Sequence, residues 1–346
     1  MLALAALGVT WGRSPGSAVL AAVGVVLALT VPVAVHHAEV VAHRVGEPLG
    51  SLVLAISVTV IEVGLIVTLM VSGGSETDTL ARDTAFAAVM ITCNGIVGVS
   101  LVVATLRRRV GTFNAEGSAT AFATVITLAT LCLVLPTFTT SAPGPEFTAT
   151  QLAFAGIASV ALYALFVFVQ NVRHRDFFLP VETDAAPAAH ASLPTPRATV
   201  VSLVALVASL VAVVGLAKVE SPAIEDAVDA LGAPPSAVGV LIALLVLLPE
   251  TLAAYRNARR GRLQTSFNLA YGSAVASIGL TIPAVALASI WLDGSLVLGL
   301  DQTQIVLLAL TAAVGALTIL PGRATLQEGG VHLVICAAFL LFALNP

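Results

Sequence analysis

The chain has 346 residues, of which 58% are apolar and only 10% are charged, and its formal net charge is −4. A soluble domain carries about 25% charged residues, so this composition excludes a soluble protein and predicts one embedded in a bilayer. The small net charge, without a basic tract or an aromatic platform, also excludes nucleic-acid binding.

Ten apolar runs reach or approach the roughly 20 residues that a helix needs to cross the hydrocarbon core. In chain order they lie near residues 18–35, 50–72, 83–106, 118–139, 149–171, 199–217, 236–255, 264–291, 303–320 and 329–345. Residues 1–12 form a further apolar run that is too short to span alone, either a truncated first helix or a mis-assigned start. The pattern predicts an all-α polytopic membrane protein. The three cysteines form no CxxC, so neither a disulfide framework nor a zinc site is expected.

The basic residues fall almost entirely on one side of these spans. Counted from the run at residues 1–12, the even-numbered loops lie at 36–49, 107–117, 172–198, 256–263 and 321–328, and they hold twelve of the 15 Lys and Arg residues. The other three are Arg13, Arg82 and Lys218. The positive-inside rule therefore places the even-numbered loops in the cytoplasm. The opposite face is acidic and would attract cations.

The longest polar interruption, residues 173–198, is rich in Pro and Ala and is predicted to be a flexible cytoplasmic linker. It divides the chain into a leading segment (1–17), a first half (18–172) and a second half (199–346). Each half contains five spans, so the two halves enter the membrane in opposite directions. This is the inverted-repeat plan of many secondary transporters, whose substrate site lies at the midplane between the repeats.

Glu62 and Glu250 each lie in the second span of their half, where almost no other ionisable residue is found. A carboxylate at bilayer depth costs about 2.5–3.5 kcal/mol on insertion scales, so it must face a partner, a cation or water. The matched placement predicts one cation site shared between the halves. The competing interpretation is a glutamate that only forms a packing hydrogen bond, and the matched placement argues against it.

The third span of each half supplies further candidate ligands. Small and polar residues are concentrated there, and those selected are Thr92, Asn94, Ser273 and Ser277. Pro249 also removes a backbone donor and can free a helix carbonyl beside Glu250. Asn94 could instead form a packing hydrogen bond, and the two serines could bond to their own helix carbonyls.

These oxygen-rich residue types suit a hard cation. Ca²⁺ takes about 6–8 oxygen ligands, and two carboxylates match its charge. Without a metal, mutual repulsion and poor solvation favour the protonated carboxyl groups. One pair of glutamates that accepts either a divalent cation or protons can exchange one for the other.

Two other groups of residues have competing interpretations. His36, His37, Glu39 and His43 could relay protons or sense a metal, but a solvated cytoplasmic turn is favoured. The arginine clusters at 107–109 and 256–262 are interpreted as topology determinants, with contact to anionic lipid as a second use of the same charge.

Three segments carry a family resemblance: HAEVVAHRVGEPLGSLVLAISVTVIEVGLIVTLM, LARDTAFAAVMITCNGIVGVSL and LLPETLAAYRNARRGRLQTSFNLAYGSAVASIGLTIPAV. They resemble the bacterial ChaA-type Ca²⁺(Na⁺,K⁺)/H⁺ antiporters of the cation/Ca²⁺ exchanger superfamily. The resemblance implies eleven helices, with one leading helix and two inverted five-helix repeats. It also implies that Glu62 and Glu250 bind the metal, and it matches Asn94 and Ser273 to polar residues of the family's motifs. Cys93 and Ala276 depart from those motifs.

The sequence therefore predicts a secondary antiporter of the bacterial inner membrane that exports Ca²⁺ in exchange for H⁺, with a monovalent Na⁺(K⁺)/H⁺ antiporter as the alternative. Enzyme activity is not expected, because no HExxH, catalytic dyad or aspartate-rich diphosphate motif lies at membrane depth. A passive channel would lack an occluded site. The expected partners are Ca²⁺, protons and the lipid bilayer, no cofactor is expected, and the oligomeric state is left open.

Overall fold

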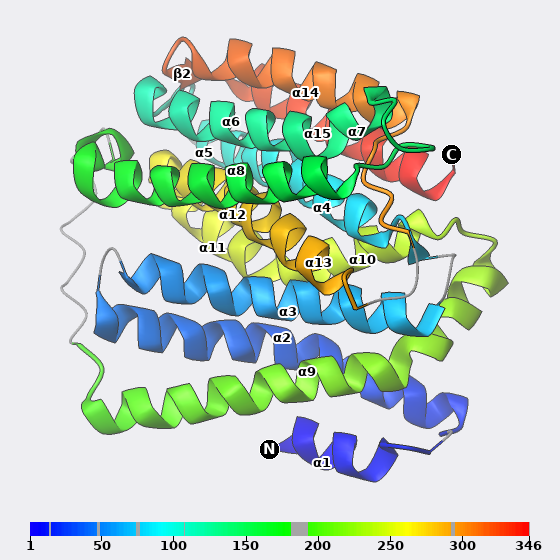
Figure 1. Cartoon of the computed structure of the whole chain (residues 1–346). Helices are drawn as coiled ribbons and strands as arrows, with labels where there is room; N and C mark the ends of the chain where they lie inside the picture. Colours follow the sequence, from blue (N-terminus) through cyan, green and yellow to red (C-terminus); the bar gives the residue numbers. More distant parts are fainter. Residues whose placement is uncertain are drawn as a thin grey trace.

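The computed structural model describes residues 1–13, 15–46, 49–73, 77–106, 108–180, 193–291 and 295–345. Almost all of these residues are helical (Figure 1). In chain order the elements are α1 (Leu2–Thr10), α2 (Ser17–Val45), α3 (Leu49–Gly73), α4 (Leu80–Met90), η2 (Ile91–Ile96), α5 (Val97–Thr105), β1 (Gly111–Thr112), α6 (Ala115–Ala129), η3 (Thr130–Val134), α7 (Leu135–Phe138), α8 (Ala149–Phe168), η4 (Val169–Arg173), η5 (Arg175–Phe178), α9 (Pro196–Leu231), α10 (Ser236–Val246), α11 (Leu248–Arg259), α12 (Leu263–Ala276), η6 (Ser277–Thr281), α13 (Ile282–Ala288), α14 (Gln302–Ile319), β2 (Arg323–Ala324) and α15 (Leu326–Leu344).

The structure confirms the ten predicted spans. Within the described residues, nine helices are long and apolar enough to cross a membrane, and the bent pair α10–α11 makes a tenth. The expected total of eleven is not confirmed, because α1 has only 9 residues and a span needs about 20. α9 is longer than predicted, since its 36 residues extend from Pro196 to Leu231.

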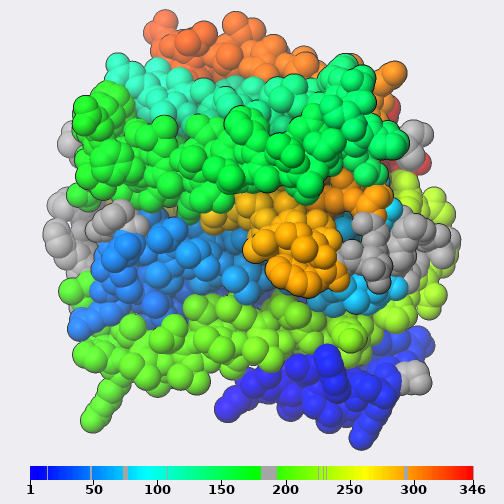
Figure 2. Space-filling view, viewed as in Figure 1, coloured from blue at the N-terminus to red at the C-terminus, as the bar shows by residue number. Residues whose placement is uncertain are grey.

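The described helices pack around three apolar clusters. One is formed mainly by α1, α2, α3 and α9, another mainly by α4–α6, α8 and α12–α15, and a small third one by Ile66, Ala81 and Val285. In Figure 1, α2, α3 and α9 lie side by side, with α1 beside α9. Figure 2 shows α13 reaching the surface between α8 on one side and α3 and α9 on the other. α4–α5 and α10–α12 lie between these outer layers, which places their polar residues in the interior (Figure 1).

Irregular turns interrupt the spans that carry the candidate residues. The π-helices η2 and η6 interrupt the helices α4–α5 and α12–α13. α10 and α11 meet at a 51° bend, and Pro249 lies in the first turn of α11. Proline is well tolerated there because the first-turn N–H groups have no helical acceptor. These interruptions occur in the second or third span of a half. η6 contacts Glu62, and the bend lies beside Glu250.

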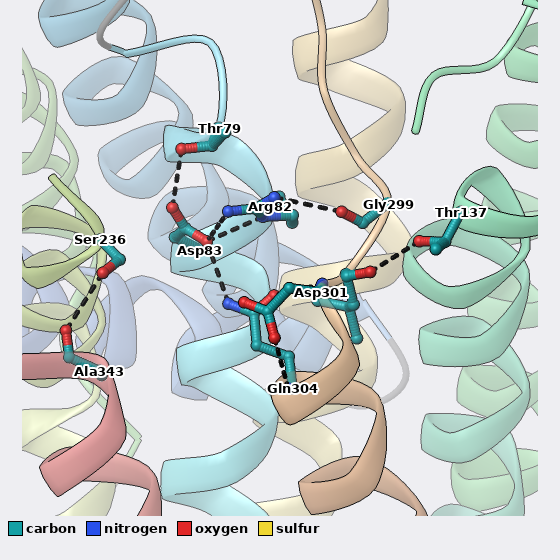
Figure 3. Close-up of polar contacts among 10 residues, drawn as sticks. Thr79, Arg82, Asp83, Thr137, Ser236, Gly299, Asp301, Gln304 and Ala343 are labelled. Carbon is teal, nitrogen blue, oxygen red and sulfur yellow. Dashed lines mark hydrogen bonds and ion pairs between the residues drawn. The ribbon is translucent and has the colours of Figure 1, made fainter. Parts of the chain in front are cut away.

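A polar network joins the beginning of α4 to the segment that leads into α14 (Figure 3). The Arg82 guanidinium contacts Asp83 Oδ1 at 2.9 Å and donates to the Gly299 carbonyl at 3.2 Å. Thr79 donates to the other Asp83 oxygen at 2.9 Å, and Gln304 donates to Oδ1 at 3.3 Å. Asp83 is only 3% exposed as a side chain, so this network stabilises a buried charge pair at one end of the bundle.

The opposite end of the bundle carries a short sheet and the described parts of the predicted linker. β1 pairs antiparallel with β2 in the register Gly111↔Ala324, Thr112↔Arg323. The linker prediction, residues 173–198, lies partly outside the described residues, which end at 180 and resume at 193. The part that is described contains η5 and the first residues of α9.

Candidate cation site

A cavity of about 180 Å³ lies in the interior of the bundle, where α3, α8, α10, α11 and α12 meet. Glu62 and Glu250 both line it, so the structure brings together one carboxylate from each half of the chain. The cavity wall also includes Ser273 and Ser277. It continues along α3 to Ser51, roughly 16 Å from Glu62 at 1.5 Å per residue.

Glu62 is buried against η6, which belongs to the other half of the chain. Its side chain is 3% exposed. Ser277 Oγ donates to Glu62 Oε1 at 2.6 Å, and Thr281 Oγ1 donates to Oε2 at 3.0 Å. A hydroxyl both donates and accepts hydrogen bonds, so these groups can donate to Glu62 when it is a carboxylate, and one of them can accept from its O–H when it is protonated. This arrangement suits a carboxyl group that changes its protonation state.

Glu250 has a different environment. It lies in the first turn of α11, just after the bend, where the positive end of the helix dipole favours a negative charge. Its Oε2 is buried and has no hydrogen-bond partner among the described residues. Pro249 has no N–H to offer the carbonyl of Leu245 four residues earlier. An unpaired buried carboxylate oxygen is costly, so Glu250 is suited to hold a cation or a proton.

Two of the six candidate ligands lie away from the glutamates. Thr92 Oγ1 donates to the Ala88 carbonyl at 2.7 Å within its own helix. Asn94 Nδ2 donates to Thr311 Oγ1 at 2.9 Å, and Asn94 Oδ1 lies 3.1 Å from His332 Nδ1. Neither residue lines the cavity. In this conformation Asn94 therefore forms a packing hydrogen bond between helices, the alternative to cation binding given in the sequence analysis. Their part in cation binding stays a prediction.

Thr281 is the residue of this site that sequence reasoning missed. It follows Ser277 by four residues, and residues at that spacing share a helix face. That spacing was the available signal. Asn268, Gln170 and Tyr163 also line the cavity and were not selected.

The histidine-rich segment is helical, which corrects the predicted cytoplasmic turn. α2 continues through His36, His37 and His43 to Val45, because no Pro or Gly occurs between His36 and Gly46. His37 Nδ1 lies 3.3 Å from Ser202 Oγ of α9. Among the described residues, no group of three His, Cys, Asp or Glu side chains could hold a metal ion.

Comparison with known proteins identifies a family and several similar proteins. The family model described as sodium/calcium exchanger protein matches residues 16–172 and 201–345. An ionic transporter of Sinorhizobium fredii, y4hA, is 47% identical over 312 residues, which cover 90% of this chain and 84% of the relative. The sodium-potassium/proton antiporter ChaA of Escherichia coli is 31% identical over 309 residues, which cover 89% and 83%.

Two solved structures have the same fold. Native YfkE matches with a TM-score of 0.75 at 15% identity, covering 100% of this chain and 97% of that one. The H⁺/Ca²⁺ exchanger CAX matches with a TM-score of 0.71 at 18% identity, covering 98% and 85%. At these identities the likeness concerns the fold.

Proposed function

We propose that this chain, which belongs to the sodium/calcium exchanger protein family, is a secondary antiporter that exports Ca²⁺ in exchange for H⁺. One observation carries the proposal: Glu62 and Glu250, from opposite halves, line the same buried cavity. Two carboxylates in one poorly solvated space bind either a divalent cation or protons. The relatives named as cation/proton antiporters support proton coupling.

The division of the chain into two repeats has independent support. One family model matches twice, at residues 16–172 and 201–345. These ranges agree closely with the proposed halves, 18–172 and 199–346, on either side of the linker. In an inverted repeat the site lies at the midplane between the halves, which is the position proposed for the glutamate pair.

The cavity suggests the side from which the cation is loaded. Ser51, Gln170 and Asn268 line its end farthest from Glu62. They lie near the ends of helices that border the arginine-rich loops, and the positive-inside rule assigns those loops to the cytoplasm of a bacterial inner membrane. We therefore infer that the described conformation loads its cation from the cytoplasmic side.

The proposed cycle uses only this chain's own groups. Deprotonated Glu62 and Glu250 take Ca²⁺ from the cytoplasm, which leaves the site with no excess charge while it turns outward. Protons displace the metal on the far side, and the hydroxyl beside the protonated oxygen of Glu62, of Ser277 or of Thr281, reorients to accept its hydrogen bond while the other hydroxyl keeps donating. The protonated carrier then returns, so the proton gradient drives export.

A monovalent Na⁺(K⁺)/H⁺ antiporter that uses the same glutamates is the second candidate. The Escherichia coli relative bears the name sodium-potassium/proton antiporter at 31% identity. In addition, both oxygens of Glu62 already accept hydrogen bonds, and of the carboxylate oxygens of this pair Glu250 Oε2 is the one that is buried without a partner among the described residues. A cation that needs fewer carboxylate oxygens would fit this arrangement.

Transport in everted membrane vesicles with a pH-sensitive dye tests both candidates. Adding Ca²⁺, Na⁺ or K⁺ to vesicles that hold a proton gradient reveals which cation moves protons. We expect Ca²⁺ to do so for the wild type and to fail for Glu62→Gln and Glu250→Gln. Unchanged exchange in both variants would refute the site, and a response to Na⁺ that Ca²⁺ does not affect would favour the second candidate.

A further inference from the structure

A second polar cavity, of about 350 Å³, lies outside the cation site where the end of α5 meets the turn between α11 and α12. Three arginines line it: Arg108 from the first half, and Arg259 and Arg260 from the second. No acidic side chain lines it within the described part of the chain. Two distant parts of the sequence thus place positive charge around one hollow.

The backbone around this cavity is shaped so that the arginines can approach one another. Gly261 adopts a φ of +76°, which L side chains rarely adopt, and this turn joins α11 to α12. The guanidinium carbon of Arg108 lies only 3.4 Å from the point where a Cβ of Gly261 would be. Arg259 also lies over the ring of Tyr255 at 5.7 Å. Glycine therefore suits this turn because of its φ, and Arg108 packs against the turn at ordinary contact distance.

Arginine in this setting selects for phosphate. The planar guanidinium offers paired N–H donors that match two oxygens of a phosphate group. A hollow lined by three such groups, whose described lining contains no acidic residue, is suited to an anion with several oxygens.

The position of the cavity indicates which phosphate it meets. The apolar span that contains α4 and α5 ends at Thr105, three residues before Arg108. Leu106 and Val110, on either side of Arg108, are 68% and 42% exposed, as expected for side chains that face lipid. The arginines therefore lie at the depth of the lipid headgroups rather than in open solvent.

We propose that this cavity binds the phosphate of an anionic phospholipid headgroup. The bound headgroup joins α5 to the end of α11, whose first turn holds Glu250. A lipid at this site would hold in place the helix that carries one of the two glutamates. This role is more specific than the general attraction of cytoplasmic arginines to an anionic surface.

Native mass spectrometry of the full-length protein in an uncharged detergent tests the proposal, with phosphatidylglycerol and phosphatidylcholine as the probes. The wild type should retain phosphatidylglycerol in preference to phosphatidylcholine. The double variant Arg108→Gln/Arg260→Gln should bind it about 30-fold more weakly, because each arginine near the surface contributes about 1 kcal/mol. Arg197→Gln is the matched control, since it removes one exposed cation from the start of α9, outside the cavity. The control should bind like the wild type.

Three results would overturn the assignment. Equal phosphatidylglycerol binding by the double variant and the wild type would show that Arg108 and Arg260 do not bind the lipid. An equal loss in Arg197→Gln shows an unspecific charge effect. Competition by millimolar inorganic phosphate identifies a free anion instead of a lipid. Should the double variant fail to fold, Arg260→Gln alone replaces it, because that side chain is exposed, and a fall of about fivefold is then expected.

Discussion

Replacing Thr281 by valine tests how Glu62 divides its preference between a cation and a proton. The Thr281 hydroxyl donates to Glu62 Oε2 at 3.0 Å in a fully buried setting. A hydrogen bond to a charged acceptor contributes about 1.5–3 kcal/mol, and one between neutral groups about 0.5–1.5 kcal/mol. Losing the hydroxyl therefore disfavours the ionised carboxylate by about 1–1.5 kcal/mol relative to the protonated form. The variant should need about 5- to 10-fold more cation for half-maximal exchange where protons compete.

The apparent KM for the cation, measured in everted vesicles over a range of pH, checks this reasoning. The difference between Thr281→Val and the wild type should shrink as the pH rises, because protons then compete less for Glu62. Thr30→Val is the matched control, since Thr30 is also buried but donates to the Val26 carbonyl of its own helix and does not line the cavity. An unchanged KM for Thr281→Val, or an equal rise for Thr30→Val, would refute the reasoning.

Three further predictions concern stability, and thermal unfolding in detergent measures each of them. Asp83→Asn should cost about 2 kcal/mol, less than the loss of a fully buried pair because the Arg82 side chain is 14% exposed; an unchanged melting temperature would contradict this. Gly239→Val should cost about 1–3 kcal/mol, since even a Cβ there would lie 2.9 Å from the Asp83 Cβ; wild-type stability would show that α10 can shift freely. His332→Leu should cost about 1–3 kcal/mol by leaving Asn94 Oδ1 without its partner, whereas a stabilised variant would oppose that assignment.

Composition and charge made the membrane character and the positions of the ten spans predictable. Glu62 and Glu250 stood out because an ionisable residue inside an apolar run has few explanations other than function. The bilayer allows only helices for such runs, so the fold class followed from the same pattern. The exposed arginines of the loops gave an orientation, which stays a prediction.

The direction in which the side chains of the third span of each half point could not be predicted from the sequence. A π-helix changes the turn within a span, so the side-chain direction beyond it no longer follows the regular helical period. η2 contains Asn94, which bonds to α14 and α15, and Thr92, which donates to its own helix. η6 contains Ser277 and Thr281, which donate to Glu62. Both segments are rich in small and polar residues, and nothing in their composition reveals this difference.

The most direct test of the central claim is proton release when the cation binds. The purified protein in a weakly buffered detergent solution receives Ca²⁺, and a pH indicator records the protons that leave. We predict release from the wild type at a pH where the carboxyl groups are partly protonated, and a much smaller release from Glu62→Gln and Glu250→Gln. Saturable Ca²⁺ binding by the wild type without any proton release would contradict the idea that metal and protons share these carboxylates.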